Sequence, residues 1–255
     1  MINQNSLSSL IYSIVFILIF SGCAPLRPST NPLLDKKALL FANQAQSFNQ
    51  HILASKGTGW ARVETNTKTD KFKIAWAAVF PNKIRITFLM SGLPIETIIA
   101  TGEKITFFSH TGEHPKTSYN SKDPDMKNYI QVPIKISEMI SILLGRLPVK
   151  NFDNAYFSPS DSSLSSIILK QKWKGETQSL CFNDKGKIDG LISTNLSGEL
   201  LYEMKITQYK TYDFGEIPVT IEIKDMDNRK LILDITSFQA NPAIKDTIFR
   251  LTESG

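Results

Sequence analysis

The sequence predicts a mainly β domain, built as a long and strongly curved antiparallel sheet whose concave side is closed by a few helices. From Trp60 onward, apolar residues recur at every second position in about eleven successive segments, a pattern typical of strands that bury one face. Turn-forming residues separate most of these segments, and helical spacing occurs in only a few places. Because no linker-like composition interrupts the pattern, we expect one β-barrel domain over residues 33–255.

The N-terminal segment has the features of an export signal. An apolar run over residues 10–20 continues directly into Ser21, Gly22 and Cys23. The run is shorter than the roughly 20 residues that a membrane-spanning helix needs, and small residues before a cysteine are what a signal peptidase cuts behind. We expect residues 1–22 to be a signal peptide and Cys23 to become the lipidated N-terminus. The alternatives are a secretory peptide that happens to contain a cysteine, and an uncleaved membrane anchor.

This segment resembles the lipobox of bacterial lipoproteins, with two differences. Phe20 stands where leucine is usual, and no Lys or Arg precedes the apolar run. Ala24 follows the cysteine, and in lipoproteins of enterobacterial type a non-acidic residue there implies release to the outer membrane. The resemblance therefore implies a bacterial outer-membrane location, facing the periplasm, with membrane lipid as a partner through the anchor.

A tether and a helix follow the anchor. Residues 23–32 contain three prolines and predict a short extended tether. Apolar residues then recur at spacings of three and four, which predicts an amphipathic helix that ends at residues 56–59. The apolar positions are Leu34, Ala38, Phe41, Ala45, Phe48 and Ile52.

The remaining elements are read from alternation and turn signals. A helical island is expected with Ser137 as its N-cap, an apolar stripe through residues 139–144 and Gly145 at its end. Residues 112–131 are expected to form a polar loop before it, and a last helical turn is expected to begin at Asn241. The expected strands cover residues 71–80, 83–90, 95–101, 104–109, 164–171, 177–182, 187–194, 200–210, 217–224 and 230–238.

The charge and the cysteines indicate which partners to expect. The net charge of +5 and the pI of about 9.0 suit a surface that tolerates phosphates or anionic headgroups. The lysines are scattered without a dense cluster, so we expect no nucleic-acid partner. Cys181, the second of two cysteines, lies in a strand-like stretch and is interpreted as a small buried hydrophobe.

The chain lacks recognisable catalytic chemistry. No nucleophile elbow, phosphate-binding glycine loop or Cys-x-x-Cys pair occurs. His110 and His114 have a spacing that can bind zinc on a helix, but glycine and proline favour a loop here and no third ligand follows. Glu96, Asp225 and Asp227 are expected to be solvated surface. We therefore predict no catalytic residues, no metal site, no cofactor and no enzyme activity.

The order of elements resembles the LolA and LolB family of periplasmic lipoprotein carriers and receptors. Three patches are similar to that family: residues 84–97 to a strand, apolar loop and strand; residues 137–148 to the helix before the second half of the sheet; and residues 232–249 to the last strand and terminal segment. The resemblance implies an unclosed antiparallel β-barrel with a helical lid over a hydrophobic cavity. The polar 112–131 segment is extra length relative to a typical receptor.

The resemblance also implies a function without bond chemistry. A LolB-like receptor would take a lipoprotein or acyl-chain cargo from a periplasmic carrier protein and deliver it for outer-membrane insertion by hydrophobic transfer. Met90, Leu93, Pro94 and Ile95 match the receptor's membrane-inserting loop, although Leu93 could instead fill the core. An alternative is a structural or interaction lipoprotein of an envelope complex with a filled barrel, and a third is an enzyme with an unrecognised motif. The expected cavity residues are Ile74, Trp76, Ile84, Ile86, Phe88, Met139, Ile140 and Leu143.

Overall fold

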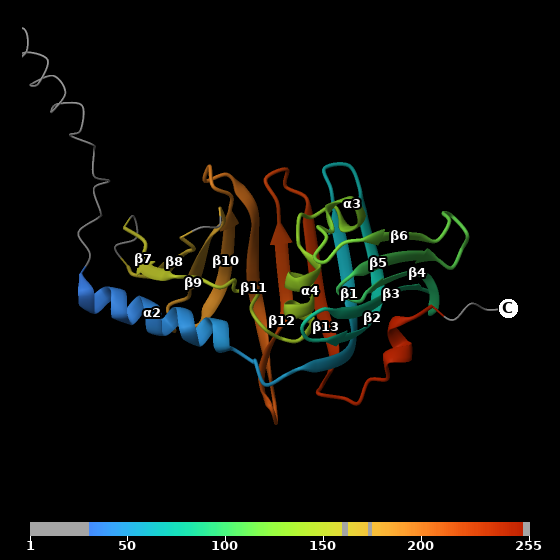
Figure 1. Cartoon of the computed structure of the whole chain (residues 1–255), viewed down its shortest axis with the longest axis horizontal. Helices are drawn as coiled ribbons and strands as arrows, with labels where there is room; N and C mark the ends of the chain where they lie inside the picture. Colours follow the sequence, from blue (N-terminus) through green and yellow to red (C-terminus); the bar gives the residue numbers. More distant parts are fainter. Residues whose placement is uncertain (1–30, 160–162, 173–174, 252–255) are drawn as a thin grey trace, which may run out of the picture.

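The computed structural model describes residues 31–159, 163–172 and 175–251. The expected signal peptide, Cys23 and all but the last two residues of the expected tether lie outside these residues. The described chain forms one antiparallel sheet of thirteen strands that is not closed into a barrel (Figure 1). The mainly β, unclosed architecture expected from the sequence is thus confirmed.

The sheet has two halves, each built from strands that follow one another in sequence. The strands of the first half are β1 (Ala54–Glu64), β2 (Thr69–Val79), β3 (Lys83–Met90), β4 (Leu93–Ala100), β5 (Lys104–Ser109) and β6 (Thr117–Asn120). The strands of the second half are β7 (Asn154–Phe157), β8 (Ser166–Lys170), β9 (Thr177–Phe182), β10 (Ile188–Thr194), β11 (Leu200–Tyr212), β12 (Gly215–Lys224) and β13 (Lys230–Ala240).

The two halves are joined by the first and last strands. β1 pairs with β13 in a ladder that runs from Ser55 opposite Ala240 to Glu64 opposite Lys230. All other neighbours in the sheet are also neighbours in the chain, so β6 and β7 become the two free edges. The segment that connects these two edges must therefore cross the sheet.

Helices lie against one side of this sheet. Helix α2 (Pro32–Ser47) packs along β7 and β8, and helix α4 (Ile136–Leu143) lies near the centre, where it contacts β2 (Figure 1). The short helix α3 (Lys127–Ile130) precedes α4. Buried apolar side chains of both helices and of most strands form one core cluster between the helices and the sheet. Among the described residues, no helix is long and apolar enough to cross a membrane.

Helix α2 is shorter than expected. Asn31 caps it, accepting a hydrogen bond from the backbone of Leu33, and it ends at Ser47. The prediction that residues 56–59 end the helix was wrong, because these residues belong to β1. The glycine at position 57 serves cross-strand packing instead: a Cβ there would lie 2.3 Å from the ring of Trp76 on β2. Sequence periodicity alone does not distinguish such a glycine from a helix stop.

Helix α4 begins two residues earlier than expected. Ser137 was predicted as its N-cap, but the cap position is Lys135. The backbone N–H and the hydroxyl of Ser137 instead donate hydrogen bonds to the carboxylate of Asp123. Asp123 thus gives a backbone N–H of the first helical turn an acceptor that the helix itself does not supply. Gly145 follows the helix with a φ of 69°, as expected of a residue that ends it.

Two further expectations were wrong. Residues 112–131 contain the edge strand β6 and the helix α3 rather than only a loop, and β6 was missed because an exposed edge strand shows no apolar alternation. The last helical turn is a 3₁₀ helix, η1 (Asp246–Phe249), that starts later than Asn241. Asn241 instead accepts hydrogen bonds from the backbone of Leu53 and Ala54 and fixes the entry into β1.

Candidate functional site

An apolar pocket lies between helix α4 and the middle of the sheet. Its walls come from β1 to β4 and β13 on one side and from α3 and α4 on the other. Its volume is about 20 Å³, which is room for about one water molecule. The lining side chains are Ala61, Ile74, Ile86, Phe88, Ile98, Met126, Ile130, Met139, Leu143, Leu231 and Leu233.

Five of the eight expected cavity residues line this pocket. The other three, Trp76, Ile84 and Ile140, do not line it and are buried in the same core cluster. Six lining residues were missed. Ile98, Leu231 and Leu233 lie in segments that were expected to be strands, and Ala61 lies in β1. Met126 and Ile130 come from the segment that was expected to be a polar loop.

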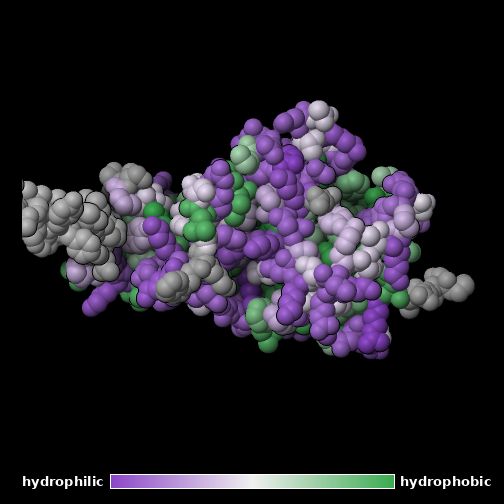
Figure 2. All heavy atoms as spheres, turned by 45° about the horizontal axis from the view of Figure 1, so that its top comes forward, coloured by the Kyte–Doolittle hydropathy of each residue, from purple (hydrophilic) through white to green (hydrophobic). Residues whose placement is uncertain are grey.

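Helix α4 is buried on most sides. Only Ser137 and Ser141 of its eight residues are not buried. The face of the molecule drawn in Figure 2 is largely hydrophilic, with separate small apolar patches. Exposing the five apolar side chains of α4 would cost about 1.5–3 kcal/mol each, on the order of 10 kcal/mol in all. The helix can therefore leave the sheet only if something apolar replaces it.

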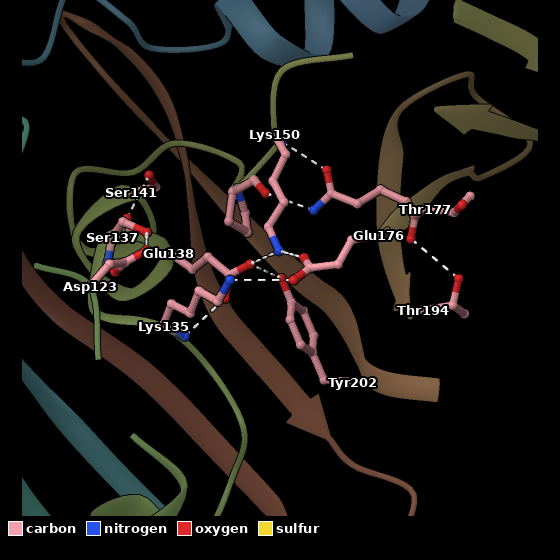
Figure 3. A network of polar contacts seen from close by, with 12 residues as sticks. Asp123, Lys135, Ser137, Glu138, Ser141, Lys150, Glu176, Thr177, Thr194 and Tyr202 are labelled. Atoms are coloured by element: carbon pink, nitrogen blue, oxygen red, sulfur yellow. Dashed lines mark hydrogen bonds and ion pairs between the residues drawn. The ribbon is translucent and has the colours of Figure 1, made fainter. Parts of the chain in front are cut away.

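A buried polar network attaches α4 to the second half of the sheet (Figure 3). Glu138 on α4 accepts hydrogen bonds from the hydroxyl of Tyr202 on β11, at 3.0 Å, and from its own helix cap at the Lys135 backbone, at 2.9 Å. Lys150 lies 3.0 Å from the Glu138 carboxylate and also pairs with Glu176. These contacts satisfy a carboxylate that is buried in the folded protein.

The network shifts the pKa values of Lys150, Glu176 and Tyr202. Burial lowers the pKa of Lys150, but the charge of Glu138 and the hydrogen bond to Glu176 outweigh it, so the pKa is raised. Burial raises the pKa of Glu176, but its hydrogen bond to Lys150 and the two lysine charges outweigh it, so the pKa is lowered. Burial, together with the Glu138 charge, raises the pKa of Tyr202. The ion pair between Lys150 and Glu176 is therefore charged at neutral pH.

The C-terminal end of α4 is also held by polar contacts. Ser55 on β1 donates a hydrogen bond to the carbonyl of Leu143 at 2.6 Å and accepts one from the indole of Trp76 at 3.0 Å. Asn49, after α2, donates to the carbonyl of Gly145 at 2.7 Å. The buried guanidinium of Arg146 donates to two carbonyls of the α2–β1 connection. The ends of the two helices are thus joined to each other.

A second, larger space lies between helix α2 and strands β9 to β11. This α2 groove has a volume of about 320 Å³, within the range of small-molecule sites. Aromatic side chains form much of its wall: Phe41 meets Phe182 at 5.6 Å between ring centroids, and Phe48 meets Tyr209 at 6.3 Å. The groove residues are Phe41, Gln44, Ala45, Phe48, Leu147, Phe182, Lys185, Gly186, Lys187, Ile188, Tyr209 and Glu216.

Two basic side chains line the α2 groove. Lys185 and Lys187 come from the turn between β9 and β10. Lys187 lies 2.6 Å from Glu216 and 3.6 Å from the ring centroid of Tyr209. The groove therefore combines aromatic side chains with charged ones in its lining, an arrangement that suits an acyl chain with a polar head. Sequence reasoning missed it because its members are distant in sequence and only half-buried.

The expected membrane-inserting residues lie at a tight hairpin. Ser91 and Gly92, both with positive φ, join β3 to β4 as a two-residue turn. Met90 and Leu93 flank this turn and are exposed, Leu93 by 70%, so Leu93 does not fill the core. Pro94 is also exposed, and Ile95 is half-buried. The insertion of this tip into a membrane remains a prediction.

The other titratable candidates have structural partners. His110 bonds Thr97, and His114 lies 2.9 Å from Glu96. Asp225, expected to be solvated, is buried and pairs with Arg229 at 2.6 Å. Across the described residues, no group of three or more His, Cys, Asp or Glu side chains is placed to hold a metal ion.

Comparisons with known proteins identify the fold. No protein-family model and no curated protein sequence matches the chain. Among solved structures, it is similar to a protein described as an outer membrane lipoprotein-sorting domain from Vibrio parahaemolyticus, with a TM-score of 0.58, 9% identity, and coverage of 84% of this chain and 97% of the other. A LolA superfamily protein from Nitrosomonas europaea matches with a TM-score of 0.57, 10% identity and the same coverage.

A DUF1329 family protein from Desulfovibrio piger is also similar, with a TM-score of 0.50, 8% identity, and coverage of 85% of this chain and 97% of the other. At these identities the likeness concerns the fold. The chain has a LolA-like fold, as its sequence indicated.

We expect Glu138→Ala to lower the free energy of unfolding by about 2–4 kcal/mol, because it leaves the buried Tyr202 hydroxyl without its acceptor and removes one charge partner of Lys150. Lys135→Met removes only the half-exposed contact with Glu176 and should cost less than about 1 kcal/mol. Urea unfolding of both variants measures the difference. Equal losses would show that the network does not hold α4.

The lowered pKa of Glu176 predicts an acid-sensitive attachment. Its contribution to stability is present above the ordinary pKa of 4.5 and is lost as the pH falls through the lower value in the folded protein. Stability measured by urea unfolding should therefore decline more steeply below pH 4.5 in the unchanged protein than in Glu176→Gln. Parallel curves for the two proteins would contradict the assignment.

Proposed function

We propose that this protein is a lipid-anchored envelope lipoprotein that binds acyl chains, free or carried by lipoproteins, on the concave side of its sheet. Anchored through Cys23 to the bacterial outer membrane and facing the periplasm, it would receive cargo from a periplasmic carrier protein, as a LolB-like receptor does. No bond is made or broken, and transfer is driven by the burial of apolar surface. The LolA-like fold supports this proposal.

The observation that carries the proposal is the α2 groove. It offers about 320 Å³ of space beside aromatic walls without any movement of the chain. The pocket under α4, by contrast, has room for about one water molecule. Cargo therefore has a preformed place to bind between α2 and β9 to β11.

An acyl chain can enter the pocket under α4 only by displacing the helix. Displacing α4 exposes apolar side chains at a cost on the order of 10 kcal/mol, and a long acyl chain gains about 0.8 kcal/mol for each buried CH₂ group. The free-energy cost of exposing α4 and the gain from burying the acyl chain are similar for a chain of about fifteen carbons. An acyl chain could thus replace the helix with little net change, whereas the helix would stay closed without cargo.

The filled pocket also favours a second candidate function. A barrel whose centre is packed with side chains suits a structural or interaction lipoprotein of an envelope complex, which carries no cargo. The two functions differ in whether acyl chains bind at all, and this difference can be measured.

Titration of the purified protein with a fluorescent fatty acid tests the proposal. We expect saturable binding that an unlabelled fatty acid displaces. Ile188→Glu places a charge in the apolar wall of the α2 groove and should weaken binding about tenfold or more, equivalent to at least about 1.4 kcal/mol. Met139→Trp fills the pocket under α4 and should leave binding at the groove unchanged.

Each outcome has a distinct meaning. Loss of binding only in Met139→Trp would move the site to the pocket under α4. The absence of displaceable binding in the unchanged protein would contradict the carrier proposal and support the structural alternative. Thermal unfolding of both variants serves as the control for folding.

The hairpin tip between β3 and β4 gives a separate prediction. Leu93→Glu should abolish lipoprotein delivery to outer-membrane vesicles while leaving folding intact, because the side chain is exposed. Leu196→Glu is a matched control, since Leu196 is an exposed leucine at the hairpin between β10 and β11. Unchanged delivery by Leu93→Glu would remove this tip from the mechanism.

A further inference from the structure

Helix α2 carries apolar side chains on its outer face as well as its inner face. Ala38, Ala42 and Ala45 point into the core. On the opposite side, Leu33 and Leu40 are 76% and 64% exposed. They are seven residues apart, so both lie on one stripe of the helix. Isolated exposed leucines are ordinary, but aligned leucines on one helix indicate a surface that another apolar phase covers.

The charges around this stripe are basic. Lys36 and Lys37 lie between the two leucines in the sequence and are exposed, and the ammonium of Lys37 is 5.7 Å from the ring centroid of Phe41. Leu39 is also exposed. The helix has one acidic residue, Asp35, which is half-buried. The far end of the outer face carries polar residues, so the leucines and lysines gather in the first half of the helix. Lysines beside apolar side chains are typical of helices that lie on an anionic lipid surface.

The covalent chain brings this end of the helix close to a membrane. Residues 24–31 separate the expected lipidated Cys23 from Pro32. Eight residues span at most about 29 Å when fully extended. The helix itself, with sixteen residues, is about 24 Å long. The leucines of its first turns are therefore the apolar surface of the described chain that is nearest to the anchor along the sequence.

We propose that the outer face of the first half of α2, formed by Leu33, Lys36, Lys37, Leu39 and Leu40, lies on the anionic surface of the membrane that holds the anchor. The leucines enter the headgroup region, and the lysines meet lipid phosphates. The proposal rests on the lipid anchor of the proposed function. It adds an orientation: α2 lies between the membrane and the α2 groove.

Other exposed apolar residues offer rival orientations. Leu93 lies at the β3–β4 tip, and Leu196, which is 86% exposed, lies at the β10–β11 tip. Neither is close in sequence to the anchor. A label at each of positions 40, 93 and 196 therefore distinguishes among three faces that could meet the membrane.

The test uses the full chain, reconstituted in vesicles of phosphatidylethanolamine and phosphatidylglycerol. Leu40→Cys, Leu93→Cys and Leu196→Cys are each made in a Cys181→Ser background and labelled with an environment-sensitive fluorophore. The measurement is quenching by brominated acyl chains. We expect the label at position 40 to lose more than half of its fluorescence and the label at position 196 to lose almost none. Thermal unfolding checks that each labelled protein is folded.

Charge reversal provides a second measurement. Lys36→Glu combined with Lys37→Glu should reduce quenching at position 40 by about half on phosphatidylglycerol vesicles, and high salt should reduce it similarly in the unchanged helix. The same change should have no effect on vesicles without anionic lipid. The matched control is Lys205→Glu, which reverses the charge of an exposed lysine on β11 and should leave quenching unchanged.

Mass spectrometry of the N-terminus separates failure of the anchor from failure of this proposal. With lipid present, absence of quenching at position 40 overturns the proposal, as does quenching only at position 93 or 196. Quenching at position 40 in a chain without lipid would support the α2 surface and contradict the anchor. A chain with neither lipid nor quenching would contradict both, and a dimer that depends on Leu40 would assign this face to a second copy instead.

Discussion

The pairing of β1 with β13 is the constraint on which the rest of the structure depends. Because the first and last strands meet in the middle of the sheet, the strands in mid-sequence, β6 and β7, become its two free edges. Thirteen strands at their usual spacing extend over roughly 55–60 Å, so residues 121–153 must cross the sheet to connect these edges. That crossing segment supplies α3 and α4. The pairing of β1 with β13 therefore accounts both for the unclosed barrel and for the helices that cover it.

The crossing segment also explains why the cover is fixed and the α2 groove is open. Helix α4 is buried among apolar side chains, and its remaining polar groups are satisfied by the Glu138 network at one end and by Ser55 and Asn49 at the other. Helix α2 contacts the periphery of the sheet and leaves space beside half-buried aromatic residues. A fold that encloses a tightly filled centre can thus offer a preformed apolar surface elsewhere. In the proposed function, cargo would bind at the groove without prior opening, whereas use of the centre would require exchange of a helix for an acyl chain.

Strand alternation predicted most of the sheet, because burial of one face leaves a period of two that is readable in segments such as residues 217–224. It also identified three of the pocket residues under α4, and the helical spacing of residues 139–144 identified two more, Met139 and Leu143. It failed where a residue's role depends on a distant neighbour. Gly57 permits the approach of Trp76, Asn241 fixes the start of β1, and Asp123 caps α4. The α2 groove was missed for the same reason: its lining residues Phe41, Phe182 and Tyr209 are far apart in sequence and come together only in the folded protein.

The central claim is that acyl chains bind between α2 and β9 to β11 while α4 stays in place. Hydrogen exchange of the protein with and without a saturating long-chain fatty acid tests it most directly, because the amides near the α2 groove and those of α4 report separately. We predict slower exchange in the second half of α2 and in the turn between β9 and β10, with unchanged exchange in α4. Unchanged exchange at the groove, or faster exchange confined to α4, would contradict this account.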